Sequence, residues 1–366
     1  MSISLHAPVV SGKTLAFWRT AQALGLIVTV VLIVGFIAQP NLALPLLWNV
    51  LIPILPATFL IAPALWRGLC PLATLNLLPN GWVARRSLST RALPSVGALG
   101  IALLVVLVPA RRFLFNEHGI PLAVVVIAVA VAALALGAFF EFKAGFCNAV
   151  CPVLPVEKLY GQHPFVELRN PRCVPCTLCT PKGCMDLAPT KSAIQALSPA
   201  HQSAAWLKTG YGIFVAAFPG FVVGYFTTAD GPLATAPSVY LNVLLWAGGS
   251  YLAVALVVGL LKVRAVVILP VLAAAAVGLY YWFVAPAVAE TLGIAPVGAV
   301  VIQGAALALV AVWLWRAMRR VHSSNGSSKI QRAQPVAERW VFWRYSIWVK
   351  RIKSTSVRIK QNQITY

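Results

Sequence analysis

The sequence has little charge and very little acidic charge. Only 10% of its 366 residues are charged, and only eight are Asp or Glu, whereas a soluble domain carries about 25% charged residues. Hydrophobic residues make up 60% of the chain. Water does not solvate that much apolar surface favourably, so the composition excludes an ordinary soluble protein.

Several functional motifs are also absent. No Walker A or GxGxxG sequence occurs, so nucleotide and flavin binding have no sequence support. The five histidines, at positions 6, 118, 163, 201 and 322, lie outside the long apolar stretches, which excludes a haem held between two histidines inside a membrane. No Cys-x-x-Cys-His sequence for haem attachment occurs. The apolar stretches also lack internal Asp, Glu and Lys, which argues against a stand-alone pump or transporter.

Eight apolar stretches are long enough, at about 20 residues each, to cross a bilayer as helices. We predict membrane helices over residues 15–38, 43–65, 93–110, 120–140, 210–227, 239–262, 265–288 and 295–316. The first stretch is too long for a signal peptide and no cleavage motif follows it, so we expect a membrane helix there. The chain is therefore predicted to be an all-α polytopic membrane protein.

The basic residues predict which helix ends face the cytoplasm. With the N-terminus inside, the inside segments and the adjoining helix ends hold 27 of the 29 Lys and Arg residues. The outside loops hold only Arg111 and Arg112. By the positive-inside rule, we predict a multi-pass protein of the bacterial inner (cytoplasmic) membrane, with both termini and the cysteines in the cytoplasm.

The C-terminal tail is strongly basic. Twelve basic residues lie between Arg316 and the C-terminus, interspersed with Trp340, Phe342, Trp343, Tyr345 and Trp348. Such a mixture suits a segment that lies on anionic lipid headgroups. Membrane lipid is therefore the expected partner of the tail and docking to a protein the alternative; we expect no nucleic acid.

Six of the seven cysteines fall within 38 residues: Cys147 and Cys151 in FCNAVCP, and Cys173, Cys176, Cys179 and Cys184 in CVPCTLCTPKGC. Cytoplasmic thiols are kept reduced, so metal binding is favoured over disulfides. Zinc ribbons use two Cys-x2-Cys pairs that are well separated. Three cysteines at spacings of three residues are instead typical of ligands to a [4Fe–4S] cluster, with zinc as the open alternative.

A Cys-x3-Cys-Pro sequence directly after a membrane helix, followed by this cysteine run, resembles polyferredoxin-type membrane proteins of nitrate and nitrous-oxide respiration, the NapH and NosR kind. A membrane ferredoxin that assists copper oxidase assembly looks similar. The resemblance covers roughly residues 60 to 190. It implies [4Fe–4S] clusters and electron transfer at the cytoplasmic membrane face, often to or from quinol. Relatives carry two full cysteine runs, whereas this chain carries one, so it resembles a reduced version.

A partial repeat involves the seventh cysteine, Cys70. WRGLCPLATLNLLP, 66–79, follows the second predicted helix as KAGFCNAVCPVLPVEKL, 143–159, follows the fourth. Alignment on Cys-Pro pairs Cys70 with Cys151, and alignment on Gly-x-Cys pairs Cys70 with Cys147. Prolines 45, 53, 56 and 63 predict kinks in the second helix, which suit either a quinone pocket or a simply irregular helix.

Seven cysteines do not supply four thiolates to each of two clusters. A single cluster would use Cys173, Cys176 and Cys179 with either Cys184 or Cys151. Two clusters would pair those three with Cys151, and leave Cys147, Cys184 and Cys70 to hold a second, incomplete cluster. Asp186 and His163 are candidates for its vacant position. We favour two clusters, because one cluster leaves three cysteines unused, and Cys70 is the least secure ligand.

The predicted organisation is a four-helix membrane half (1–140), a small inserted ferredoxin-like iron–sulfur segment (141–209), a second four-helix half (210–316) and the tail (317–366). We predict a membrane-bound electron-transfer protein, a subunit rather than a stand-alone enzyme. It would relay electrons between a membrane donor, quinol or a neighbouring subunit, and a redox partner protein or larger complex. The alternatives are an accessory reductase for metalloenzyme assembly and a non-redox scaffold with structural zinc.

Overall fold

The structure is a computed structural model that describes residues 3–6, 12–79, 86–169, 189–197 and 204–331. Cys173, Cys176, Cys179 and Cys184 and the tail beyond residue 331 lie outside the described residues. The chain forms two compact units, residues 1–318 and 319–366. The features below belong to the first unit, apart from the end of the helix α13 (Val297–Gln331), which continues past residue 318.

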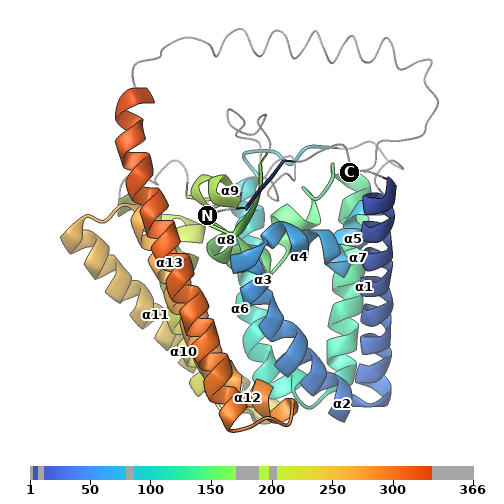
Figure 1. The fold of residues 1–366 in the computed structure, drawn as a ribbon. Helices are drawn as coiled ribbons and strands as arrows, with labels where there is room; N and C mark the ends of the chain where they lie inside the picture. The colour runs from blue at the N-terminus through green and yellow to red at the C-terminus, as the bar shows by residue number, and fades with distance from the viewer. Residues whose placement is uncertain (1–2, 7–11, 80–85, 170–188, 198–203, 332–366) are drawn as a thin grey trace, which may run out of the picture. The chain divides into compact units, whose positions relative to one another are not determined.

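Eight described helical segments are long and apolar enough to cross a membrane (Figure 1). They are α1 (Gly12–Ala38); α2 (Pro40–Pro45), η1 (Leu46–Leu51) and α3 (Ile52–Ile61) as one span; α6 (Leu93–Ala110) with η2 (Arg111–Phe115); α7 (Gly119–Phe139); α10 (Gly210–Thr227); η8 (Leu233–Thr235) with α11 (Ala236–Leu261); α12 (Ala265–Thr291); and α13 (Val297–Gln331). This confirms the polytopic helical membrane protein and its eight predicted spans.

The second span is irregular, as its prolines predicted. Pro45 ends α2, and the following residues, Leu46–Leu51, form the π-helix η1. The helix breaks at Ala62, whose φ of −154° and ψ of 79° are extended. Pro63 then begins the short helix α4 (Pro63–Leu69). A proline has no backbone N–H to donate and restricts the residue before it, which explains both irregularities.

Helix α10 lies at the centre of the second group of spans. In an 18-residue apolar stretch of α10, 61% of the residues are buried, compared with 6% in such a stretch of α1. Helix α10 therefore packs against other parts of the protein, whereas α1 exposes most of its side chains. Gly220 and Gly224, the GxxxG pair, allow α11 to approach closely. A Cβ at Gly220 would collide with the carbonyl oxygen of Trp246, and one at Gly224 would lie 2.9 Å from Cα of Val243. Small residues of this kind commonly mediate membrane helix packing.

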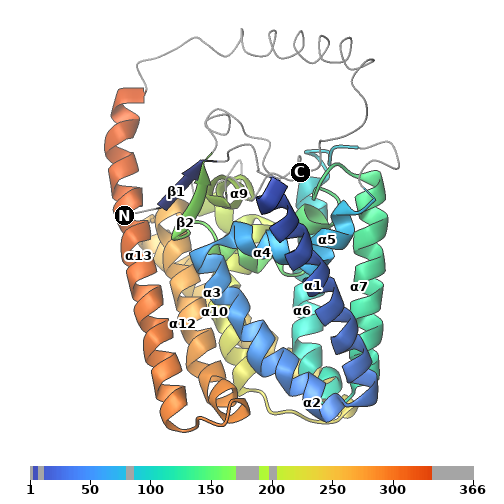
Figure 2. The ribbon, with the colours of Figure 1, turned by 45° about the vertical axis from the view of Figure 1, so that its right-hand side comes forward.

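Short elements gather at one end of the spans, the upper end in Figure 1. They are α4, α5 (Pro71–Leu77), η3 (Phe146–Val150), α8 (Leu154–Tyr160), α9 (Pro189–Gln195) and η7 (Ala204–Lys208). A parallel pair of strands, β1 (Ile3–His6) and β2 (Val166–Arg169), lies there too (Figure 2). The sequence analysis did not predict this pair, because four residues are too few to show an alternating pattern.

Candidate functional site

Two of the described cysteines occupy equivalent breaks in the chain. Cys70 separates α4 from α5, with φ −56° and ψ 124°, and Cys151 follows η3, with φ −60° and ψ 123°. Each precedes a proline, which disfavours the helical conformation at the cysteine, and a short helix begins just beyond each break. This geometry matches the repeat alignment that pairs Cys70 with Cys151, rather than with Cys147.

The structure brings Cys70, Cys147 and Cys151 together. Cys147 is 8% exposed and packs in a small apolar cluster with Ala73 and Phe146, and the two other cysteines pack against the same cluster. All three are free thiols. The grouping joins parts of the chain almost 80 residues apart, one from each copy of the partial repeat.

Asn76 of α5 holds the Cys147 side chain. The Cys147 Sγ donates to Asn76 Oδ1 at 3.9 Å, and Asn76 Nδ2 donates to the carbonyl oxygen of Ala133 in α7 at 2.9 Å. Asn76 is fully buried. A Cβ at Gly137 would collide with the backbone oxygen of Asn76, so α7 packs tightly against this turn of α5. The asparagine thus links one thiol to a membrane helix.

Burial keeps these thiols protonated in the absence of a cation. It raises the pKa of Cys147 well above its usual value, and the nearby Arg67 guanidinium opposes that effect. Burial, and next the Cys70 thiol, raises the pKa of Cys151 to about 12. Burial likewise raises the pKa of Cys70. Since thiolates are the metal-binding form, a bound metal would have to supply the positive charge, and binding would release protons.

A buried charged network lies beside the three thiols. Arg67 of α4 pairs with Glu157 of α8, Nη1 to Oε2 at 3.4 Å, and their side chains are 3% and 5% exposed. Arg67 Nη2 also donates to Asn148 Oδ1 at 2.5 Å, next to Cys147 in η3. Lys143 Nζ donates to the carbonyl oxygen of Arg67 at 2.9 Å. The network therefore joins both copies of the partial repeat.

The network contains more positive than negative charge. Lys158 is also buried, so the described part of the network contains three buried cationic side chains and one buried carboxylate, that of Glu157. Burial, together with Arg67, lowers the pKa of Lys158 to about 8. Buried cationic side chains are stabilised by anionic groups nearby, so an anionic group at the thiols would be favourable. The electrostatics of this site thus favour an anion.

Removing Arg67 is expected to destabilise the protein strongly. Arg67→Met would leave the Glu157 carboxylate buried without its cation, a loss on the order of 3–5 kcal/mol in the free energy of unfolding. Thermal unfolding in detergent measures it. Arg91→Met, at an exposed arginine, is the matched control and should leave the midpoint unchanged. Equal midpoints for the two variants would contradict a structural role for the network.

The described residues do not by themselves form a metal site: among them, no group of three or more His, Cys, Asp or Glu side chains lies where it could hold a metal ion. The cysteine run, with Asp186, lies outside these residues. The three grouped thiols nevertheless fit a sulfur-ligated anionic cluster in donor type and in surrounding charge.

Sequence analysis missed four residues of this site: Arg67, Asn76, Asn148 and Glu157. Arg67 and Glu157 are 90 residues apart and meet only through the fold. One signal was available. Glu157 is among only eight acidic residues in the chain and follows a Cys-Pro by five positions.

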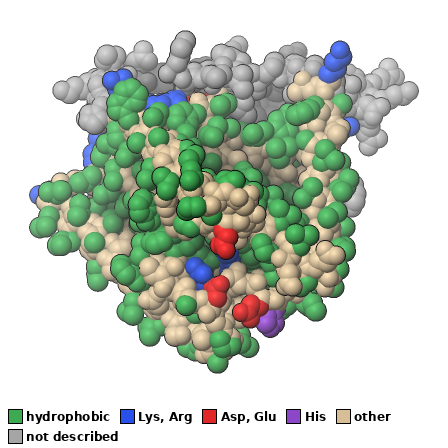
Figure 3. Space-filling model, turned by 60° about the horizontal axis from the view of Figure 1, so that its bottom comes forward, with side chains coloured by type: hydrophobic (Ala, Val, Ile, Leu, Met, Phe, Trp, Pro, Cys, Tyr) green, Lys and Arg blue, Asp and Glu red, His purple; other side chains and the backbone are tan. Residues whose placement is uncertain are grey.

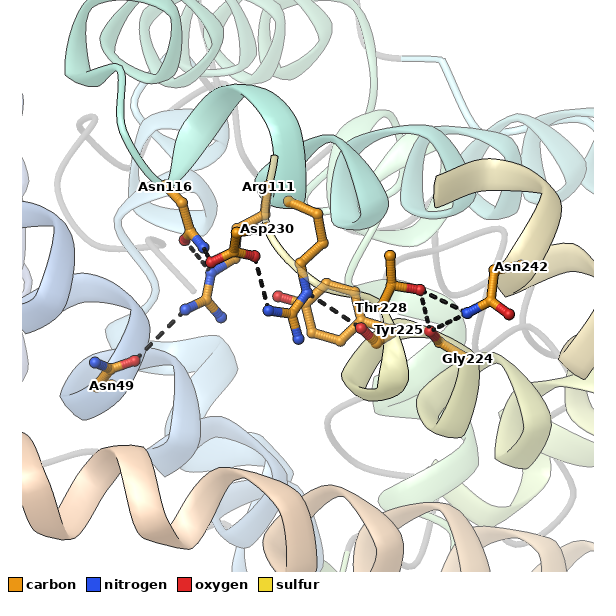
Figure 4. Close-up of polar contacts among 9 residues, drawn as sticks. Asn49, Arg111, Asn116, Gly224, Tyr225, Thr228, Asp230 and Asn242 are labelled. Carbon is orange, nitrogen blue, oxygen red and sulfur yellow. Dashed lines mark hydrogen bonds and ion pairs between the residues drawn. The ribbon is translucent and has the colours of Figure 1, made fainter. Parts of the chain in front are cut away.

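A second polar cluster occupies the opposite ends of the spans. Arg112 Nη1 pairs with Asp230 Oδ1 at 2.8 Å, and Arg112 Nε donates to the carbonyl oxygen of Tyr225 at 3.1 Å. Asn242 Nδ2 donates to Thr228 Oγ1 at 2.7 Å (Figure 4). Figure 3 shows basic side chains here in a hollow flanked by acidic ones. The Arg112 bonds fasten the chain around residue 230 to η2, and the Asn242 bond fastens it to α11.

Comparison with family models, curated proteins and solved structures finds no match for this chain.

Proposed function

We propose that the protein is a membrane electron-transfer protein with one or two [4Fe–4S] clusters, of the polyferredoxin type that its cysteine motifs resemble. The observation that carries the proposal is the grouping of Cys70, Cys147 and Cys151 beside a buried network rich in positive charge. An anionic, thiolate-ligated cluster suits both features. A zinc ion with four thiolate ligands is also anionic, so a measurement of bound iron and zinc decides between an iron–sulfur cluster and zinc.

The proposed ligands are Cys173, Cys176, Cys179 and Cys184 of the run together with the three grouped thiols. When bound, a cluster supplies a carrier that accepts and releases one electron at a time. Arg67, Lys143 and Lys158 favour the added negative charge by their position beside the thiols. The apolar packing of Cys147 excludes water from it.

We propose quinol or a neighbouring subunit as the donor and a redox protein or larger complex as the acceptor. We place the site at the cytoplasmic face of a bacterial inner membrane. The described basic residues near the cysteines support that orientation: Arg67, Lys143 and Lys158 lie at the cysteine end of the spans, whereas Arg111 and Arg112 lie at the other. A quinol donor would release two electrons in separate single-electron steps, and its two protons to solvent.

Anaerobic protein in liposomes tests electron transfer. Addition of a lipophilic quinol should bleach the visible sulfur-to-iron absorption and produce a reduced-cluster EPR signal, because the donor reaches the site from the bilayer. Dithionite serves as the positive control. Reduction by dithionite but never by quinol would restrict the donor to a protein subunit. If the protein shows no visible absorption in either the oxidised or the reduced state, the proposal is wrong.

The cluster's midpoint potential should depend on pH. Below about pH 8 Lys158 is protonated, and its charge stabilises the more negative reduced state. Loss of that proton above about pH 8 should lower the potential by some tens of millivolts, at an effective dielectric constant of about 20. Redox titration from pH 6.5 to 9.5 measures this. In Lys158→Met the step should vanish and the potential should stay at the lower value.

A further inference from the structure

An elongated apolar cavity runs between α3, α6 and α10. Its volume is about 350 Å³, within the roughly 300–1,000 Å³ of small-molecule sites. Phe218, Val222 and Tyr225 line it from α10, at the spacing of one helix face. The lining residues of the second span run from Trp48 to Phe59, about 16 Å at 1.5 Å per residue. The cavity thus has the proportions of a site for a chain-like molecule.

The two ends of the cavity differ in polarity. At one end it reaches Pro152, Val153 and Tyr160, directly after Cys151. At the other end lies Arg111, the single charged side chain in the described lining. A lipophilic molecule whose polar headgroup requires a cation would therefore bind with that headgroup at the Arg111 end of the cavity.

The partners of Arg111 leave it attractive to an acceptor. Its Nε donates to Asn116 Oδ1 at 2.7 Å and its Nη2 to Asn49 Oδ1 at 3.5 Å, and its guanidinium lies 4.7 Å from the centre of the Trp48 ring (Figure 4). These groups are neutral. The nearby Asp230 accepts bonds from Arg112 and Asn116. The described hydrogen bonds thus pair the Asp230 carboxylate with Arg112, whereas those of Arg111 go to two neutral amide oxygens at the end of an apolar cavity.

We propose that the cavity binds a lipophilic molecule whose oxygen-bearing headgroup accepts hydrogen bonds from Arg111, with its apolar chain along α10. The headgroup chemistry is a carboxylate or phosphate of an acidic lipid, or a quinone carbonyl. A guanidinium presents several donors to such oxygens, and a low-dielectric surrounding strengthens the attraction. The assignment does not depend on the proposed clusters.

Organic extraction of detergent-purified protein, followed by mass spectrometry, tests the proposal. The wild type should retain about one such molecule per chain. Arg111→Met should reduce retention about tenfold, Arg111→Lys should restore most of it, and Val222→Trp, which fills the cavity, should abolish it. Size-exclusion elution checks that each variant folds. If Arg111→Met does not fold, the retention of the ligand by Val222→Trp decides whether the cavity is the binding site.

The identity of the extracted molecule separates an acidic lipid from a quinone, and either supports the assignment. Tyr160→Phe is the control for orientation, since Tyr160 lines the opposite end, and it should leave retention unchanged. Loss of the ligand in Tyr160→Phe but not in Arg111→Met would overturn the assignment of the headgroup. Equal retention by the wild type, Arg111→Met and Val222→Trp would overturn the site itself.

Discussion

Replacing Cys176 by serine is expected to remove at least half of the bound iron, and the visible sulfur-to-iron absorption should bleach with it. Cys176 is the middle cysteine of the closely spaced run, so its loss affects the ligand set that defines the proposed site. Serine has nearly the same size, so lost packing would not explain the change. Iron content and absorption of anaerobic protein measure the effect.

The neighbouring substitution Thr177→Ser is the control for this experiment. It changes one methyl group in the same segment and removes no thiolate, so iron and absorption should match the wild type. Unchanged iron in Cys176→Ser would show that the cysteine run holds no cluster. The proposal would then lose its main ligand set.

Replacing Cys184 by serine is expected to remove about half of the iron. In the two-cluster hypothesis Cys184 serves the incomplete cluster with Cys147 and Cys70, while Cys173, Cys176, Cys179 and Cys151 hold the other. The cluster that does not use Cys184 should keep its own EPR signal, because each cluster has a separate ligand set. A single cluster that used Cys184 would instead lose all its iron together.

Cys70→Ser sharpens the same test. The two-cluster hypothesis predicts that Cys70→Ser changes only one of two EPR signals. The one-cluster hypothesis predicts no change in the EPR spectrum. The structure places Cys70 against the apolar cluster that contains Cys147, so a buried serine hydroxyl there should also be tested for stability. Ala73→Ser, in the same cluster, is the packing control. About four irons per chain and no response to Cys70→Ser would decide for one cluster.

The membrane architecture was predictable because its signal is local. A continuous apolar stretch identifies each span without knowledge of its neighbours, and all eight predicted stretches correspond to described spans. The proline kinks were readable for the same reason. Each depends on the residue's own backbone, and not on a distant partner.

The surroundings of the thiols were less predictable because they depend on distant contacts. The Arg67–Glu157 pair joins α4 to α8, and the Asn76 bond to Ala133 joins α5 to α7. No local pattern encodes which buried polar groups will meet. The partial repeat gave the nearest indication: one of its two alignments pairs Cys70 with Cys151, and the backbone angles of these two residues agree.

The central claim is that these cysteines hold iron–sulfur clusters. Quantifying iron, zinc and acid-labile sulfide in anaerobically purified protein, with EPR after dithionite reduction, tests it most directly. Our account predicts iron and sulfide in equal amounts, at roughly four or eight per chain, and a reduced-cluster signal. Zinc without sulfide, or protein that contains neither metal, would contradict it.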